Sequence, residues 1–246
     1  MFPAHWPVYA TGTPYPGITR MLRSTLCLLA SLLASPAALA SLAIDRSILV
    51  FETGKSPRQD VMASNAGDTN LFLEVEVLEV ISPGTDQEQR NVVRDPESIG
   101  FVAAPRRLMV PPQGRRPVRL MNINGHGDVE RVYRVNIKPV LPPAETEGLG
   151  VRIVVAYQVL VFVAPKTIDV RLEGQRDGNR LTLRNTGNVN LMLANGRQCT
   201  MINGSDCVEV QGRRLYPGNS VVIELPSANP VTFEVDANGQ RQIRQF

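Results

Sequence analysis

Residues 71–80 carry the pattern that most constrains the fold of this chain. In this segment the apolar residues Leu73, Val75 and Val77 alternate with Glu74 and Glu76. Successive side chains of a β-strand point to opposite faces, so the alternation predicts a strand with one buried and one solvent-facing side. An amphipathic helix would need apolar residues three or four positions apart, and almost no segment of the sequence has that period.

Similar short runs recur along the rest of the chain, and turn-forming residues separate them. Asp177-Gly178-Asn179 and Pro217-Gly218-Asn219 are two such turns, because Gly, Asn and Pro favour tight turns. Many short strands between turns predict antiparallel β-sandwiches. Besides 71–80, strands are expected at residues 44–51, 58–64, 107–110, 117–122, 131–138, 151–163, 168–172, 180–184, 189–194, 207–210, 213–216, 220–224 and 231–235.

The N-terminal region has the features of a secretory signal peptide. Arg23 supplies a positive charge, residues 26–33 are apolar but too few to span a bilayer, and the small residues of Ala38-Leu39-Ala40 suit signal peptidase. We therefore expect residues 21–40 to be a signal peptide that is cleaved before Ser41. Residues 1–20 are expected to be an upstream segment that arises from a start-site artefact.

The expected mature chain, residues 41–246, has a length that suits two small domains. We place their boundary at Pro165, because proline cannot continue the hydrogen bonding of a strand; the domains are then residues 41–165 and 166–246. Each has an Asn-x-Gly turn before an apolar strand, at Asn65 and at Asn185. This repeated motif supports two related domains, although shared turn chemistry alone would produce the same repetition. The sequence thus predicts an all-β protein, with two tandem immunoglobulin-like β-sandwich domains around an interdomain cleft.

Charge and composition argue against several functional classes. The formal net charge of +3 falls to +1 on cleavage, since Arg20 and Arg23 leave and no acidic residue does. A nearly neutral chain lacks the basic surface that nucleic-acid binding requires. The mature chain has a single histidine, His126, and so has no histidine pair to hold a metal or relay a proton. We expect no catalytic residues, metal, cofactor, nucleic acid or small-molecule substrate.

Cys199 and Cys207 are the two cysteines that remain in the mature chain. In an exported protein an even number of cysteines predicts a disulfide. A zinc site would need two further ligands nearby, and the sequence has none there. We therefore expect one structural disulfide that closes a short hairpin loop.

Residues 151–163 form the longest run of β-branched residues. Apolar side chains occupy one side of this expected strand throughout, whereas the other side begins with Arg152 and becomes apolar further along. The second half, residues 159–163, is expected to be a core strand. The first half follows the polar loop 141–150, which favours an edge strand. An exposed apolar edge can add itself to a partner's sheet and fill the partner's pockets with alternate side chains.

Several spaced features occur in a fixed order along the mature chain. They are Ile44-Asp45-Arg46 before Val50-Phe51, Arg107-Leu108 followed by Pro112 and Gly114, the stretch from Glu130 to Val135, the long strand that ends at Pro165, the Asn185 turn, the cysteine pair and Tyr216-Pro217-Gly218. This ordered set resembles the periplasmic pilus-assembly chaperones of the PapD-like superfamily. The Val-Tyr-Arg-Val stretch and the strand with Tyr157 are most similar to the alternate (class 5, alpha-type) fimbrial chaperones.

The resemblance implies a periplasmic, non-enzymatic chaperone. Such a protein holds a pilin subunit that lacks its final strand and passes it to an outer-membrane usher. Val151, Ile153, Val155 and Tyr157 would fill the open groove of the pilin, and no ATP site is needed. The same apolar edge would let free molecules self-associate.

At two places this sequence departs from the better-known family members. Those members bind the terminal carboxylate of the pilin with an arginine on the first strand and a lysine on the long strand, where this chain has Ile48 and Leu160. The candidate substitutes are Arg134, ranked first because it should lie beside the long strand, and Arg46 and Arg152; a guanidinium fork can bind both carboxylate oxygens.

The second departure concerns the family's interdomain charge cluster. Glu130 and Asp236 match its two acids, but Ala164 stands at the position of the base. Either Arg134 replaces the base, or the two domains are set together differently.

Two other functional classes compete with the chaperone hypothesis. A periplasmic hydrolase would use paired carboxylates such as Glu74 with Glu76, or Asp95 with Glu97. Alternating glutamates are ordinarily the solvated face of a strand, and the sequence has no Gly-x-Ser-x-Gly motif. A structural or adhesive fimbrial protein would usually carry an N-terminal donor extension, whereas the first expected strand here begins soon after Ser41.

Overall fold

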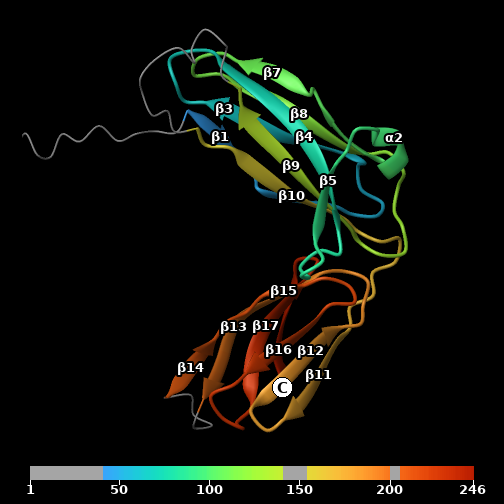
Figure 1. Cartoon of the computed structure of the whole chain (residues 1–246), viewed down its shortest axis with the longest axis vertical. Coiled ribbons are helices and arrows are strands. Elements are labelled where there is room, and N and C mark those ends of the chain that lie inside the picture. Colours follow the sequence, from blue (N-terminus) through green and yellow to red (C-terminus); the bar gives the residue numbers. More distant parts are fainter. Residues whose placement is uncertain (1–40, 141–153, 200–205) are drawn as a thin grey trace, which may run out of the picture. The chain divides into compact units, whose positions relative to one another are not determined.

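The computed structural model describes residues 41–140, 154–199 and 206–246. Within these ranges the chain forms two successive β-sandwiches (Figure 1), which confirms the expected all-β fold class. The helix α2 (Pro96–Ile99) is a single turn in the first sandwich. No helix of the described residues is long and apolar enough to cross a membrane.

The first sandwich is built from two facing sheets. One has the strand order β1-β3-β8-β6, and the other has the order β2-β10-β9-β4-β5, with β7 also paired to β4. The strands are β1 (Leu42–Ile44), β2 (Ile48–Phe51), β3 (Arg58–Asn65), β4 (Leu71–Ile81), β5 (Gln89–Val92), β6 (Phe101–Ala104), β7 (Arg107–Val110), β8 (Arg115–Asn122), β9 (Arg131–Pro139) and β10 (Tyr157–Val163).

The second sandwich also has two sheets, ordered β11-β12-β16 and β14-β13-β17-β18, with β15 paired to β13. Its strands are β11 (Leu172–Asp177), β12 (Arg180–Asn185), β13 (Leu191–Cys199), β14 (Cys207–Val210), β15 (Arg214–Leu215), β16 (Ser220–Glu224), β17 (Val231–Ala237) and β18 (Gln240–Gln245).

Each sandwich encloses its own apolar core. On β4, the expected alternation holds: Leu73 and Val75 are buried in the first core, while Glu74 is half-buried on the outer face. In the same core, the rings of Phe101 and Tyr133 stack with centroids 4.5 Å apart. The second core is centred on fully buried residues of β12, β13 and β17, namely Leu181, Leu183, Leu191, Leu193, Val231 and Phe233.

The two Asn-x-Gly turns have the same internal role in the two sandwiches. Asn65 is buried, and its Nδ2 donates to the carbonyl oxygens of Thr69 (2.7 Å) and Val110 (3.1 Å), while its Oδ1 accepts from the N–H of Gly67. Asn185 is also buried; its Nδ2 donates to the carbonyl oxygens of Val189 (2.8 Å) and Leu215 (3.0 Å), and its Oδ1 accepts from the N–H of Gly187. The Asn-x-Gly motif that is repeated in the sequence therefore places Asn65 and Asn185 in equivalent hydrogen-bonding positions of the two sandwiches.

Some expected strands differ from the observed ones. Residues 44–51 are not one strand, because β1 pairs with β3 in one sheet and β2 pairs with β10 in the other. Between them, Asp45 keeps the chain attached to the first sheet, since its Oδ1 accepts from the N–H of Met62 at 2.8 Å. The segment 168–172 is irregular up to Leu172, where β11 begins.

The strands β5, β6 and β18 have no counterpart among the expected strands. β5 and β18 consist mainly of polar, exposed residues, so neither has the apolar alternation by which the others were recognised. β10 begins at Tyr157, and residues 154–156 precede it without forming a strand; the first part of the expected strand, residues 151–153, lies outside the described residues.

Candidate functional site

One edge of β10 is only partly covered by a neighbouring strand. β9 pairs with β10 along its whole length, from Tyr157 to Val163. On the other edge, β2 pairs in parallel with Leu160–Val163 alone, and the pairing starts where the N–H of Leu160 donates to the carbonyl oxygen of Ser47 at 2.8 Å. Within the described residues, Tyr157 to Val159 therefore have no strand on that edge.

The uncovered edge continues into an apolar segment. Val154 and Val155 are 43% and 40% exposed, and neither belongs to a strand. On β10 itself, Tyr157 packs partly buried against the first core, and Val159 is fully buried. An unpaired edge next to exposed β-branched residues has the chemistry that strand addition requires. Of the other residues expected on this strand, Val151, Arg152 and Ile153 lie outside the described residues.

A cation lies on the outer face of the sheet beside this edge. Arg134 of β9 stands directly opposite Leu160 of β10 and Leu78 of β4. Its Nη1 donates to Oε1 of Gln158 at 2.8 Å, whereas its Nε is buried and lacks a hydrogen-bond partner among the described residues. An arginine that is flanked by apolar side chains and not paired with a carboxylate can bind an anion.

The electrostatic surroundings of Arg134 include Glu88, in the loop between β4 and β5. The pKa of Glu88 is lowered mainly by the hydrogen bond from the N–H of Gly84, with added contributions from Arg90 and Arg134. Glu88 itself pairs with Arg90 at 2.7 Å, so its carboxylate is already engaged by other groups.

Arg46, the second candidate cation, forms a local ion pair. It lies in the exposed link between β1 and β2, where its Nε is 3.1 Å from Oδ2 of Asp45. The neighbouring acid neutralises its charge, so Arg46 is less suited than Arg134 to hold an anion.

Glu130 connects the two sandwiches. It directly precedes β9, and its carboxylate accepts hydrogen bonds from the backbone N–H of Asn190 (3.1 Å) and from Nδ2 of Asn190 (3.0 and 2.8 Å). Burial raises the pKa of Glu130 from 4.5 to about 7, and the hydrogen bonds from Asn190 and the field of Arg214 partly offset this rise. A carboxyl group with this pKa titrates near neutral pH.

Asp236 has different partners. It lies on β17, where its carboxylate accepts from the N–H of Gly239 at 3.0 Å and pairs with Nε of Arg241 at 3.1 Å. The two acids expected in an interdomain cluster thus bond to different parts of the chain: Glu130 to Asn190 of the second sandwich, and Asp236 to its own sheet. The sequence patterns did not single out Asn190, which was expected only as part of the strand 189–194 and in the structure directly precedes β13.

A small apolar cluster lies where the second sandwich contacts the end of β10. Its buried members are Val80, Val132, Phe162 and Tyr216. Tyr216 comes from the Tyr216-Pro217-Gly218 turn of the second sandwich, and its ring centroid is 6.4 Å from that of Phe162. The turn was expected, but this packing depends on the approach of two distant segments.

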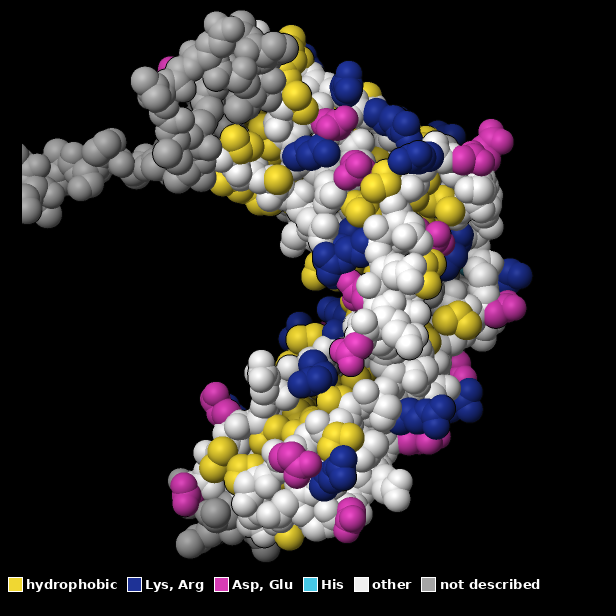
Figure 2. All heavy atoms as spheres, in the orientation of Figure 1, with side chains coloured by type: hydrophobic (Ala, Val, Ile, Leu, Met, Phe, Trp, Pro, Cys, Tyr) yellow, Lys and Arg dark blue, Asp and Glu magenta, His cyan; other side chains and the backbone are white. Residues whose placement is uncertain are grey.

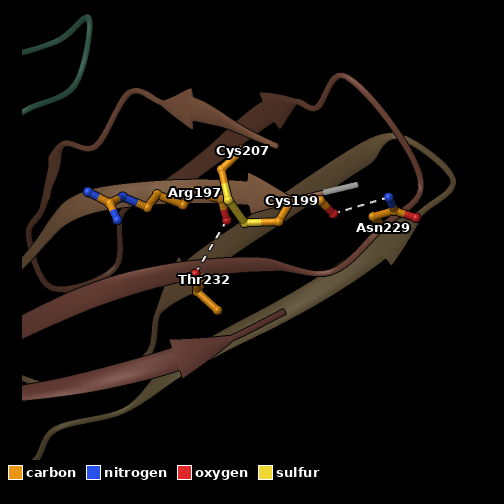
Figure 3. The surroundings of a disulfide bond; sticks show 5 residues. All are labelled: Arg197, Cys199, Cys207, Asn229 and Thr232. Carbon is orange, nitrogen blue, oxygen red and sulfur yellow. Dashed lines mark hydrogen bonds between the residues drawn. A yellow bond between two sulfur atoms is a disulfide. The ribbon is translucent and has the colours of Figure 1, made fainter. Parts of the chain in front are cut away.

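Cys199 and Cys207 form the expected disulfide. Cys199 at the end of β13 is bonded to Cys207 at the start of β14 (Figure 3). Nearby, Nδ2 of Asn229 donates to the carbonyl oxygen of Cys199 at 3.2 Å. The hydroxyl of Thr232 donates to the carbonyl oxygen of Arg197 at 3.3 Å. The bridge thus joins two neighbouring strands of the second sandwich, far in sequence from β10.

The carboxylates that a hydrolase would use have other partners. Oε2 of Glu74 lies 3.3 Å from Nζ of Lys138, and Oε2 of Glu76 accepts a hydrogen bond from Nδ2 of Asn136 at 3.3 Å. Asp95 accepts from the N–H of Glu97 at 3.1 Å, at the start of α2. The described residues contain no group of three metal-ligating side chains.

Charge is mixed on the face of the protein that Figure 2 draws. Figure 2 shows Lys and Arg side chains interspersed with Asp and Glu on the face that it draws, so neither sign dominates that face. This distribution differs from the continuous basic surface that is typical of nucleic-acid binding.

Comparisons with known proteins give a consistent result. No family model matches the chain. The chaperone protein ClpE of Escherichia coli is 26% identical over 210 residues, which cover 85% of this chain and 72% of ClpE.

Two solved structures share the fold. The class 5 fimbriae chaperone CfaA superposes with a TM-score of 0.63 at 22% identity, covering 83% of this chain and 98% of CfaA. The SafB chaperone of Salmonella enterica, solved in complex with the SafA pilin, has a TM-score of 0.60 at 15% identity, over 86% of this chain and 98% of the matched one. These similarities confirm the resemblance to PapD-like fimbrial chaperones and the two-domain immunoglobulin-like fold.

Proposed function

We propose that this chain is a fimbrial chaperone that binds a pilin subunit by adding its own strand to the subunit's incomplete sheet. The observation that carries the proposal is the uncovered edge at Tyr157 to Val159, which continues into the exposed Val154 and Val155. The similarity in fold to a chaperone that was solved with its pilin supports the same interpretation. The relatives found are chaperones, so no catalytic role is assigned.

In this mechanism the backbone and the side chains of the edge have separate tasks. The free N–H and C=O groups of the edge hydrogen-bond to the pilin and give affinity, while alternate side chains fill the pockets of its groove. Val151, Ile153 and Val155 are the side chains that we assign to these pockets, whereas Tyr157, which was also expected there, packs partly buried against the first core of this protein. Each Val- or Ile-sized side chain that becomes buried contributes about 1.5–3 kcal/mol. Binding of this kind is reversible, because another strand with the same pattern can replace the edge.

Arg134 is the residue that we assign to the terminal carboxylate of the pilin. Its guanidinium lies beside Leu160 on the face next to the open edge, and it has no carboxylate partner among the described residues. Arg46 already pairs with Asp45. Arg152, which lies outside the described residues, remains a candidate.

The cellular setting is also part of the proposal. Residues 21–40 would direct export and be removed, residues 41–165 and 166–246 would form the two domains in the periplasm, and an outer-membrane usher would receive the pilin. No nucleotide is required, because the strand of the next subunit drives release. Without a pilin, two copies would pair through the same apolar edge and shield it.

Co-expression with a candidate pilin subunit tests the proposal. We expect a soluble one-to-one complex in the periplasm, and degradation of the pilin when the chain is absent. If the chain instead enters the assembled fimbria as a stoichiometric component, it is a structural or adhesive subunit and the chaperone function is wrong.

A further inference from the structure

The carboxylate of Glu130 is the start of a chain of polar contacts that leads into the second sandwich. The side chain of Asn190 bonds on both sides: its Nδ2 donates to Glu130 at 2.8 Å, and its Oδ1 accepts from Nη1 of Arg214 on β15. A cation that bonds to an amide oxygen polarises the amide and strengthens its N–H donors. Arg214 therefore strengthens, through Asn190, the hydrogen bond that the carboxylate of Glu130 accepts.

Arg214 also contacts β10 directly. The guanidinium carbon of Arg214 lies 5.1 Å from the ring centroid of Phe162, which is within the range of a cation–π interaction. Phe162 is buried near the end of β10, in the cluster that includes Tyr216. One side chain of the second sandwich thus holds both the start of β9, through Asn190 and Glu130, and the end of β10.

The charged groups around this contact are few. Among the described residues, Arg214 is the cation whose field acts on Glu130, and Arg134 bonds to Gln158 instead. Tyr216 lies near the same charged groups. Burial raises the pKa of its hydroxyl, Arg214 and Arg134 lower this pKa, and Glu88 and Glu130 raise it.

We propose that Asn190 and Arg214 are positioning residues, through which the second sandwich holds the end of the strand that is offered to the client. β9 and β10 are paired along the whole of β10, so fixing the start of one and the end of the other fixes the register of both against the second sandwich. The chain then needs no base at Ala164, because Arg214 supplies the charge from another strand. The importance for the client rests on the proposed function, whereas the contact itself exists without a client.

Two neighbouring arginines give a matched test. Arg214→Met removes the charge and keeps an apolar side chain, and Arg213→Met is the control, because Arg213 is exposed and its side chain forms no hydrogen bond or ion pair with the described residues. We expect amide hydrogen exchange at residues 160–163 to be about threefold to thirtyfold faster in Arg214→Met, as expected for the loss of a cation–π contact, and unchanged in Arg213→Met. Arg214→Lys should restore most of the protection.

A second measurement separates positioning from general destabilisation. The pKa of Glu130, followed by NMR of its carboxyl carbon, should rise by about one unit in Arg214→Met and stay unchanged in Arg213→Met. Both measurements use the free protein, so they test the link even if no pilin is captured. With a pilin that the unaltered chain captures, Arg214→Met should bind several-fold more weakly than Arg213→Met. Equal exchange rates and equal Glu130 titration in the two variants would overturn the inference.

Discussion

Arg134 of β9 lies directly opposite Leu160 of β10, in the same cross-strand row as Ile48 of β2. Ile48 is 51% exposed and Leu160 is partly buried, so the row offers apolar surface with one cation inside it. The resemblance to the pilus-assembly chaperones implies that Ile48 and Leu160 stand where better-known members carry their carboxylate-binding arginine and lysine. The positive charge in this row therefore lies on β9, one strand further from the edge strand β2 than Leu160 of β10.

The first prediction concerns this cation. Arg134→Ala should weaken capture of a pilin by about tenfold or more, because a charge-assisted bond to a carboxylate is worth about 1.5–3 kcal/mol. The measurement is the dissociation constant for a pilin peptide with a free terminal carboxylate and for the same peptide with a terminal amide. The loss should be confined to the free carboxylate.

Arg46→Ala is the matched control, since Arg46 already pairs with Asp45. It should leave both dissociation constants nearly unchanged. If Arg134→Ala weakens the two peptides equally, Arg134 has no role in carboxylate binding.

The second prediction addresses the open edge. Val155→Asp should abolish capture of the pilin and leave the free protein folded, because Val155 is exposed and not part of a strand. A charge cannot enter an apolar pocket without a large desolvation cost. Ile153→Asp should act in the same way. Pull-down of the pilin and circular dichroism of the free variants are the measurements.

Val222→Asp is the control for surface charge, as Val222 is 43% exposed on β16 of the second sandwich. It should retain the pilin. Retention of the pilin by Val155→Asp would refute the assignment of this residue to the client groove.

The third prediction is a pH dependence of stability that comes from Glu130. Its pKa in the folded protein is about 7 against an ordinary value of 4.5, so the folded state binds the proton more tightly than the unfolded state. The resulting stabilisation is complete below pH 4.5 and disappears as the pH rises to about 7. Across this window the free energy of unfolding should fall by about 3 kcal/mol at most.

Urea unfolding between pH 4.5 and 8 measures this effect. Glu130→Gln should remove this part of the slope, whereas Glu209→Gln should keep it, because Glu209 is exposed on β14 and its carboxylate forms no hydrogen bond or ion pair with the described residues. Identical slopes for the two variants would show that Glu130 does not titrate in this range.

The fourth prediction concerns the paired turns. Asn65→Ala and Asn185→Ala should each destabilise the protein by about 2–4 kcal/mol, because each removes the hydrogen bonds to two or more carbonyl groups, at least one of them buried, and to one N–H. Thermal unfolding is the measurement. Asn124→Ala is the comparison, since its amide makes a single long contact of 3.5 Å, and it should cost under about 1 kcal/mol. A clear difference between Asn65→Ala and Asn185→Ala would contradict the equivalence of the two turns, and a loss of the same size in Asn124→Ala would show that the extra hydrogen bonds do not cause it.

The strands that the sequence predicted best are those whose register is set by one buried face. β4, β7, β9 and β16 appear within one residue of the expected bounds, since period-two alternation is a local property of the chain. β5 and β18 were missed because they are polar edge strands, held by hydrogen bonds to a neighbour rather than by burial of side chains.

By itself, the sequence determined the two-sandwich fold class, the Asn-x-Gly turns, the disulfide and the apolar character of the strand that ends at Pro165. These depend on periodicity, turn chemistry and cysteine number, which are properties of neighbouring residues. Only the tertiary structure decided that β2 stops short of Tyr157, that Arg134 shares a row with Leu160, and that Glu130 reaches Arg214 through Asn190. Strand pairing and contacts between sandwiches join residues far apart in the chain, and no local pattern encodes which of them meet.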